Sequence, residues 1–225
     1  MKYALSALAG ATALAISLIA GPAMAQDGGI VVYNAQHESL TEAWVEGFTK
    51  ETGIKVTVRH GGDSDLSNQI VAEGAASPAD VFLTENSPAM ALVESSGLFA
   101  PVDADTQAQV PQEYQPASGK WVGIAARSTV FVYDKTKLTA EQLPKSLLDL
   151  ADPSWKGRWA ASPSGADFQA IVSALVQLKG EAAAADWLKA MKENFTAYKG
   201  NSTVLKAVNA GEVEGGVIYH YYYYG

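Results

Sequence analysis

Four short polar clusters in this sequence contain side chains that can bind a metal ion or an anion. One ends in His37, the next centres on Glu85, a third is rich in serine and glycine, and the last is a histidine followed by four tyrosines. In sequence order they occupy residues 34–37, 84–86, 162–167 and 220–224. Each follows an apolar run that predicts a buried strand. Ligands of open α/β sheets sit beyond the carboxyl ends of the strands, so the four clusters are expected to line one crevice.

A donor set of one histidine, one glutamate and two tyrosines has a clear chemical preference. Phenolate and carboxylate are hard anionic oxygen donors, which suit Fe³⁺ far better than Zn²⁺ or Cu⁺. A free tyrosine has a pKa of about 10, so only a strongly polarising cation makes the phenolate the main form at neutral pH. Two phenolates and one carboxylate supply three negative charges, which match Fe³⁺. The pattern therefore indicates ferric iron, held by His37, Glu85 and two of the tyrosines at 221–224.

The serine- and glycine-rich cluster suggests how the remaining metal positions are filled. Four protein ligands leave an octahedral ion with two open positions. Ser164, Gly165 and Ala166 lie at a predicted helix N-terminus, where free N–H groups and the helix dipole favour an anion. Asn201 and Ser202, at the start of another predicted helix, can add donors from the same side. We therefore expect phosphate or carbonate beside the metal.

Each of these residues also has an ordinary explanation. A lone histidine after a strand, such as His37, is more often a surface or capping residue. Glu85 can simply be a charge favoured at a helix N-terminus, and residues 164–166 can be a cap that binds nothing. Tyrosine runs are common in strands and interfaces. The combination supports a metal site, whereas no single member does.

The elements that must position these clusters follow an α/β order. Apolar β-branched runs predict strands at 30–33, 55–58, 79–83, 122–126, 129–133, 157–161 and 215–219. Helical patterns lie between them at 39–52, 65–73, 88–95, 146–150, 168–179, 182–193 and 204–210. A capping box at Ser39 and Glu42 is predicted to open the first helix, and Gly53 to end it. Short strand–helix–strand connections imply parallel pairing, so we predict two α/β lobes joined by the strands at 122–133.

The N-terminus predicts export. Lys2 precedes an apolar run at residues 4–20, and an Ala-x-Ala site ends at Ala25. The run is short for a membrane span, which needs about 20 residues, so residues 1–25 are predicted to be a cleavable signal peptide and the protein to be periplasmic. The absence of cysteine excludes lipid attachment, disulfides and thiolate sites. A formal charge of −8 argues against nucleic acid as a partner.

Several stretches resemble one protein family. They are 30–37 (IVVYNAQH), 51–56 (ETGIKV), 78–85 (PADVFLTE), 126–134 (ARSTVFVYD), 149–157 (DLADPSWKG), 162–166 (SPSGA) and 200–202 (GNS). On these residues the sequence resembles the periplasmic ferric-iron-binding proteins, the substrate-binding components of bacterial Fe(3+) ABC transporters. The resemblance implies an α/β type 2 periplasmic binding protein, with two α/β lobes joined by crossover strands and a ligand cleft between them. The lobes are expected at 26–126 and 127–225.

The resemblance also implies a function and a set of site residues. The function is capture of Fe(3+) with a synergistic anion, phosphate or carbonate, and delivery to an inner-membrane ABC permease by a monomeric, non-enzymatic protein. The implied iron ligands are His37, Glu85, Tyr221 and Tyr222. The implied anion-binding residues are Ser164, Gly165, Ala166 and Asn201. Arg127 matches an arginine near the cleft, whose expected role is cleft support: of the anion, of a metal ligand, or only of the hinge.

Two features depart from the family pattern. Family members usually carry Asn two positions before the first ligand tyrosine, where this sequence has Tyr219, so the anion site is expected to differ. Family members also continue well beyond the tyrosine pair. The second lobe is therefore expected to be incomplete and the protein to be truncated at its C-terminus, with apolar surface exposed on the last strand and helix.

Two alternatives follow from the residues. A related binding protein for a polyamine, an oxyanion or a thiamine-like molecule would share the fold, and the tyrosine run could serve a polyamine. An exported enzyme is not favoured, because the sequence lacks a Gly-x-Ser-x-Gly elbow, a His-Glu-x-x-His motif and any cysteine nucleophile.

Overall fold

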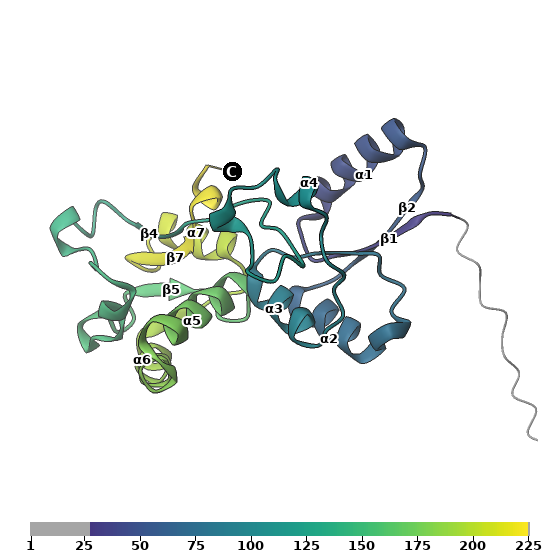
Figure 1. The fold of residues 1–225 in the computed structure, drawn as a ribbon. Coiled ribbons are helices and arrows are strands. Elements are labelled where there is room, and N and C mark those ends of the chain that lie inside the picture. The colour runs from purple at the N-terminus through teal and green to yellow at the C-terminus, as the bar shows by residue number, and fades with distance from the viewer. Residues whose placement is uncertain (1–27, 225) are drawn as a thin grey trace, which may run out of the picture.

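The computed structural model describes residues 28–224, which form two α/β lobes, each with its own sheet (Figure 1). The predicted signal peptide lies outside the described residues. Within residues 28–224, no helix combines the length and the apolar composition needed to span a membrane.

The first lobe contains a parallel three-stranded sheet. Strands β1 (Ile30–Asn34), β2 (Val56–His60) and β3 (Val81–Leu83) are arranged in the order β2-β1-β3. The accompanying helices are α1 (Glu38–Thr52), α2 (Asp63–Glu73), α3 (Ser87–Ser95) and the short α4 (Ala104–Gln107). The core of this lobe forms where α2 and α3 cover the sheet, around Tyr33, Leu66, Phe82 and Val93. Because β1 and β3 are neighbours and parallel, the clusters that follow them start at the same edge of the sheet.

The start of α1 differs from the prediction. The helix begins at Glu38 with His37 as N-cap and has no side-chain capping bond, so the predicted capping box at Ser39 and Glu42 is wrong. The earlier start buries Thr41, whose hydroxyl donates to Asn34 Oδ1 at 2.8 Å. The same oxygen also accepts the Gln36 N–H at 3.0 Å, so the start of α1 is tied to the end of β1. The helix ends at Gly53, which has a φ of 73°, as predicted.

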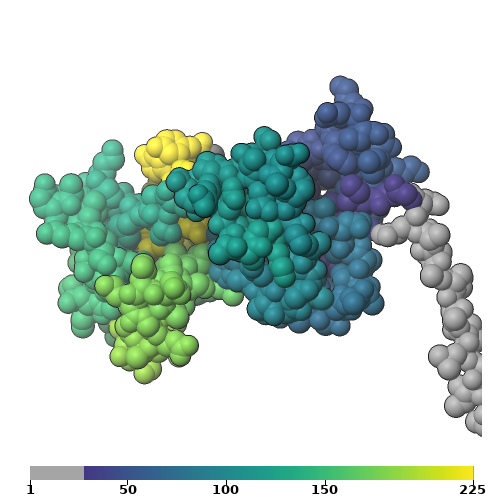
Figure 2. Space-filling model, viewed as in Figure 1, coloured from purple at the N-terminus to yellow at the C-terminus, as the bar shows by residue number. Residues whose placement is uncertain are grey.

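The connection between the lobes contains only one of the two predicted strands. Residues 122–126 pair with no other strand among the described residues, and Ile124 is 59% exposed. A β-branched run becomes a strand only where a sheet edge offers its hydrogen bonds. Here the Gly123 N–H bonds instead to the Tyr114 carbonyl in a loop, at 3.0 Å. In Figure 2 the teal segment that follows α3 covers the junction of the two lobes on the face shown.

The second lobe has a mixed four-stranded sheet. Its strands are β4 (Thr129–Tyr133), β5 (Trp159–Ala161), β6 (Phe195–Ala197) and β7 (Gly215–Tyr219), in the order β4-β7-β5-β6 with β4 antiparallel to β7. Its helices are α5 (Ala166–Lys179), α6 (Glu181–Asn194) and α7 (Asn201–Asn209). The predicted helix at 146–150 is a 3-10 turn at Leu147–Ala151, and β6 was not predicted.

Two cores lie on opposite faces of this sheet. Trp159, Phe168 and Trp187 belong to the core that α5 and α6 cover, and Val204 and Ile218 to the core under α7. Strand β7 is central and buried along its whole length, so the expected apolar exposure of this last strand is wrong. The position of β7 between β4 and β5 sends its C-terminal residues directly toward the first lobe (Figure 1).

Candidate metal centre

Three of the four predicted metal ligands meet where the lobes face each other. The Nε2 atom of His37 lies 3.7 Å from Glu85 Oε1 and 3.5 Å from the hydroxyl oxygen of Tyr221. The rings of His37 and Tyr221 meet edge to face, with centroids 6.1 Å apart. His37 and Glu85 follow β1 and β3 of the first lobe, whereas Tyr221 follows β7 of the second. The structure thus brings together residues that are up to 184 positions apart.

The turn after β7 determines which tyrosines face this point. The His220 N–H donates to the Ser128 carbonyl at 2.9 Å, and the Ser128 N–H donates to His220 Nδ1 at 3.1 Å. These bonds extend the β4–β7 pairing by one residue, after which the backbone turns as a 3-10 helix, His220–Tyr223. The rings of Tyr221 and Tyr222 stack with centroids 4.4 Å apart, so the fourth predicted ligand lies against the third.

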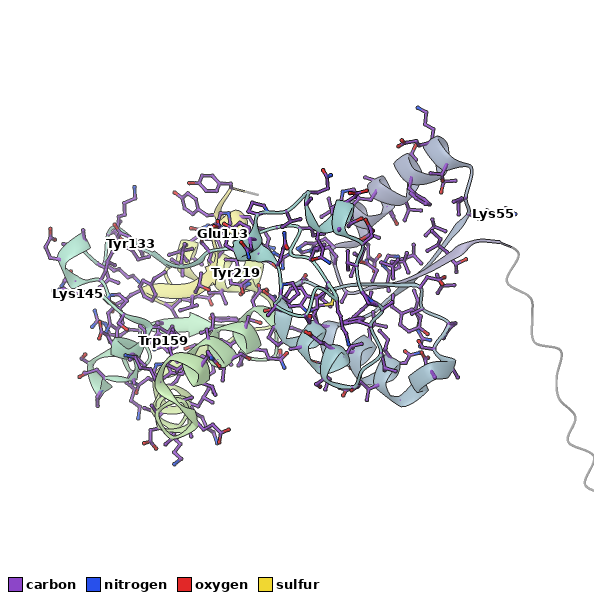
Figure 3. The ribbon with its side chains drawn as sticks, viewed as in Figure 1. Lys55, Glu113, Tyr133, Lys145, Trp159 and Tyr219 are labelled. Atoms are coloured by element: carbon purple, nitrogen blue, oxygen red, sulfur yellow. The ribbon has the colours of Figure 1, made fainter. Side chains whose placement is uncertain are left out.

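The remaining two tyrosines are exposed. Tyr223 is 60% exposed and Tyr224 is 83% exposed, whereas Tyr221 and Tyr222 are partly buried. This difference favours Tyr221 and Tyr222 as the pair with a role at the site. Figure 3 labels Tyr219, at the end of β7 where the yellow strand meets the first lobe.

Glu85 is held by the start of α2. The carboxylate of Asp63 accepts the Glu85 N–H at 2.9 Å and the Asn86 N–H at 3.4 Å. Asn86 is then the N-cap of α3, which begins at Ser87 and has Pro88 in its first turn, as the sequence predicted. Backbone bonds to one buried carboxylate therefore fix the direction in which Glu85 leaves the sheet.

Burial makes the acidic groups of the site reluctant to ionise. Burial raises the pKa of Glu85 to about 7, with a further rise from the charge of Asp167, while Arg127 opposes the shift. Burial likewise raises the pKa values of Tyr221 and Tyr222 well above the ordinary phenol value. The two phenols therefore keep their protons at neutral pH unless a strongly polarising cation replaces them.

Arg127 connects the three segments that carry these groups. It donates to the Glu85 carbonyl at 2.8 Å and to Gln36 Oε1 at 2.9 Å, and lies 3.9 Å from the Glu85 carboxylate. Its guanidinium carbon is 5.4 Å from the centre of the Tyr221 ring, a cation–π distance. The predicted cleft-support residue is thus in direct contact with both lobes.

Asp167 is a residue of this site that the sequence did not reveal. It is 8% exposed, and its carboxylate accepts hydrogen bonds from Asn86 of the first lobe, at 3.0 Å, and from Asn201 of the second. The Tyr219 hydroxyl donates to the side-chain oxygen of Asn86 at 3.0 Å and so extends this network. Asp167 stands in the predicted 162–167 cluster, but an acidic residue in the first turn of a helix is common and carries no specific signal.

The predicted anion-binding residues surround this carboxylate only in part. Gly165 is the N-cap of α5 and has no side-chain capping bond, Ala166 is the first helical residue, and Ser164 is exposed. Asn201 begins α7 and bonds to Asp167. A cavity of about 10 Å³ beside Asp167 and Asn201 has room for about one water. The carboxylate of Asp167, in the first turn of α5, therefore already takes the side-chain amide of Asn201.

The donor set depends on phenols. Among residues 28–224, no group of three or more His, Cys, Asp or Glu side chains is arranged to hold a metal ion. His37 and Glu85 become a candidate centre only together with the tyrosines that follow β7. Hard oxygen donors of this kind suit Fe³⁺.

Known proteins resemble this chain in sequence and in fold. The family model of bacterial extracellular solute-binding proteins matches residues 76–225. The "Fe(3+)-binding periplasmic protein" of Serratia marcescens is 68% identical over 225 residues, covering 99% of this chain and 67% of that protein. The "Major ferric iron-binding protein" of Neisseria meningitidis serogroup B is 42% identical over 214 residues, covering 94% and 64%. The chain thus spans about two thirds of the length of these relatives.

A solved structure agrees with these matches. Iron-bound HitA from Pseudomonas aeruginosa superposes with a TM-score of 0.82 at 43% identity, covering 87% of this chain and 64% of that one. The resemblance and the fold class inferred from the sequence are thereby confirmed. The chain belongs to the bacterial extracellular solute-binding protein family, with the two-lobed α/β fold of the type 2 periplasmic binding proteins and ferric-iron-binding proteins among its relatives.

Proposed function

We propose that this protein captures Fe³⁺ in the periplasm and delivers it to an inner-membrane ABC permease. One observation carries the proposal. At the junction of the lobes, His37 Nε2 lies 3.7 Å from the Glu85 carboxylate of its own lobe and 3.5 Å from the Tyr221 hydroxyl of the second lobe. Tyr222, stacked on Tyr221, is the fourth ligand. The names of the relatives, which bind ferric iron, support the same ion.

Metal ligands that come from both lobes should make metal binding favour the closed form of the protein. An ion that contacts both lobes favours the closed arrangement by the difference between its affinities for the closed and open forms. The closed form is the one proposed to dock on the permease, as a monomer that performs no catalysis. A signal peptide at residues 1–25 is proposed to direct export.

The anion is the part of the proposal that the contacts constrain most. Phosphate or carbonate would bind at Ser164, Gly165, Ala166 and Asn201, at the N-termini of α5 and α7. The carboxylate of Asp167 lies at the same helix end and carries the same sign of charge. An exogenous anion must displace or share the contacts of Asp167, so we expect a weak dependence of iron binding on added phosphate.

The test is a ferric titration of the purified protein. Fe³⁺ is added as a weak chelate, with and without phosphate, while the visible spectrum is followed. A broad phenolate-to-iron charge-transfer band should grow to saturation near one equivalent. The Tyr221→Phe/Tyr222→Phe variant should lack the band, and Tyr223→Phe/Tyr224→Phe, which changes the two exposed tyrosines, should retain it.

The outcomes separate iron from other ligands. A band that saturates and disappears only in the 221/222 variant supports a tyrosine-ligated ferric site. No band and no iron binding would refute the proposal, and a screen of polyamines and oxyanions would follow. A band that persists in the 221/222 variant would move the ligand assignment elsewhere.

A further inference from the structure

Gln36 contacts two groups of the candidate site through a single atom. Gln36 is 8% exposed, and its Oε1 accepts hydrogen bonds from the His37 N–H at 3.0 Å and from the Arg127 guanidinium at 2.9 Å. Two donors directed at one oxygen identify that atom as the amide oxygen, because an amide nitrogen accepts neither. Gln36 thus joins the backbone of a predicted iron ligand to the arginine that contacts both lobes.

A buried asparagine holds the backbone of Gln36 in place. Asn34 is 1% exposed, its Oδ1 accepts the Gln36 N–H at 3.0 Å, and its amide nitrogen donates to the Gln36 carbonyl at 2.9 Å. The Thr41 hydroxyl donates to the same Asn34 oxygen. The Asn34 side chain therefore fixes the backbone of the loop after β1 at Gln36. A fixed backbone at this residue limits the directions in which the Gln36 side chain can point.

The position of Arg127 depends on this contact. Its guanidinium bonds to Gln36 after β1 and to the Glu85 carbonyl after β3, and so spans two strand ends of one sheet. From there it lies over the Tyr221 ring of the other lobe. Without the Gln36 oxygen, one of its two hydrogen-bond anchors is lost, and the long side chain regains rotational freedom.

We propose that Gln36 is a positioning residue of the metal site, one that sets His37 and Arg127 in a fixed relation to Tyr221. The inference rests on the proposed ferric function. The acceptor oxygen of Gln36 holds the charged guanidinium in place. That charge then acts on Glu85, 3.9 Å away, and on the Tyr221 ring.

The test replaces the amide and follows two quantities. Gln36→Met keeps the approximate volume and removes the acceptor, whereas Gln36→Glu keeps an acceptor oxygen. Ferric affinity is measured by competition with a chelator, and the wavelength of the phenolate band is recorded in the same samples. Gln69→Met is the matched control, since Gln69 is a partly buried glutamine of the first lobe that bonds to Tyr33 and Glu73.

The expected results separate positioning from packing. Gln36→Met should weaken ferric affinity by about tenfold or more, the usual effect of losing a partner that orients metal ligands. It should also move the band to longer wavelength, because the guanidinium no longer stabilises the electrons of the Tyr221 phenolate. Gln36→Glu should recover most of the affinity, and Gln69→Met should change neither quantity. In a protein that already carries Arg127→Met, Gln36→Met should reduce ferric affinity by a smaller factor than it does in the wild-type protein.

Clear outcomes would overturn the inference. Wild-type affinity and an unmoved band in Gln36→Met, or an equal loss in Gln36→Glu, would leave Gln36 as a packing residue. If Gln36→Met does not fold, Gln36→Asn decides by the same readouts, since its shorter side chain keeps the amide but not the reach. If the wild-type protein binds no ferric iron, both the proposed function and this inference fail. If the wild-type protein binds ferric iron and Gln36→Met binds it with the same affinity, only the inference fails.

Discussion

Tyr221 and Tyr222 differ from His37 in the charge that they bring to a metal. A bound phenol loses a proton and becomes an anion, whereas the imidazole stays neutral. Burial raises the pKa values of both tyrosines, so this proton is lost only to a strongly polarising ion. The tyrosines therefore select for a highly charged cation more strongly than the histidine does.

Loss of either tyrosine hydroxyl should reduce ferric affinity more than loss of the histidine side chain. We expect Tyr221→Phe and Tyr222→Phe each to weaken ferric affinity by at least about 100-fold, the upper end for losing a mere orienting partner. His37→Ala should cost clearly less, because a neutral ligand is lost. Chelator competition measures all three, with Tyr224→Phe as the exposed control. Equal losses in the three site variants, or none, would contradict this ranking.

Glu85 should make the stability of the metal-free protein depend on pH. Its pKa is raised from an ordinary 4.5 to about 7, with burial as the main cause. Between these values the folded state binds more protons than the unfolded state, so the free energy of unfolding falls as pH rises through this window. The effect is at most about 3.5 kcal/mol, from about 1.4 kcal/mol for each pKa unit.

Urea unfolding of the metal-free protein at pH 5 and pH 8 tests this effect. The wild-type protein should lose stability between the two values, and Glu85→Gln should lose distinctly less, because the substituted amide does not ionise. The same pH dependence in both proteins would show that Glu85 is not the group responsible.

Strand β7 illustrates how close packing between elements positions the site. A Cβ atom added at Gly216 would meet Val204 Cγ1 of α7 at 2.4 Å. The absence of a side chain at this position lets α7 lie directly on the sheet. Helix α7 begins at Asn201, which bonds to Asp167, and β7 leads into Tyr221. The distance between α7 and β7 therefore affects the position of Asn201 relative to that of Tyr221.

Gly216→Ala should destabilise the protein by about 1–3 kcal/mol, the range for overpacking a well-filled core. Gly47→Ala is the matched control, since Gly47 lies in α1 with open space around it and should gain about 0.5–1 kcal/mol. Urea midpoints of both variants provide the measurement. A Gly216→Ala protein as stable as wild type would mean that α7 can move without cost.

At the level of the whole molecule, a buried network of hydrogen bonds joins the two lobes. Asn86 of the first lobe donates to Asp167 and accepts from Tyr219, both of the second lobe, at 3.0 Å each. Asp167 is buried, so its carboxylate would lack a hydrogen-bond donor if Asn86 were removed. Opening of the lobes would then give that carboxylate water as a partner, which favours the open form. These contacts are expected to favour the closed arrangement even without metal.

Asn86→Ala should shift the metal-free protein toward more open arrangements. Loss of a hydrogen bond to a buried charge changes such an equilibrium by about tenfold or more. Small-angle X-ray scattering should show a larger radius of gyration for the variant than for wild type. Asn68→Ala is the control, because the exposed Asn68 side chain donates to the Ser64 carbonyl within the same helix, α2. An unchanged radius in Asn86→Ala would mean that other contacts hold the lobes together.

The sequence alone determined the features that depend on near neighbours along the backbone. Apolar runs ending at residues 33, 83, 161 and 219 located the strand ends within one residue, and with them the clusters that hold His37 and Glu85. Gly53 ends α1 because its left-handed conformation is a local property of glycine. The α/β fold class followed from the order of elements and is confirmed. The roles of the ligand residues stay predictions until iron binding is measured.

The tertiary structure decided everything that depends on partners far apart in the sequence. Gln36 and Arg127 are 91 positions apart, and Asn86 and Asp167 are 81 apart, so no local pattern relates them. Residues 122–126 have the composition of a strand but find no partner edge among the described residues. Asp167 resembles any acidic residue at a helix start until folding buries it between two asparagines. The physical reason is shared: a hydrogen bond or a buried charge gains its meaning from the group that faces it, and only folding chooses that group.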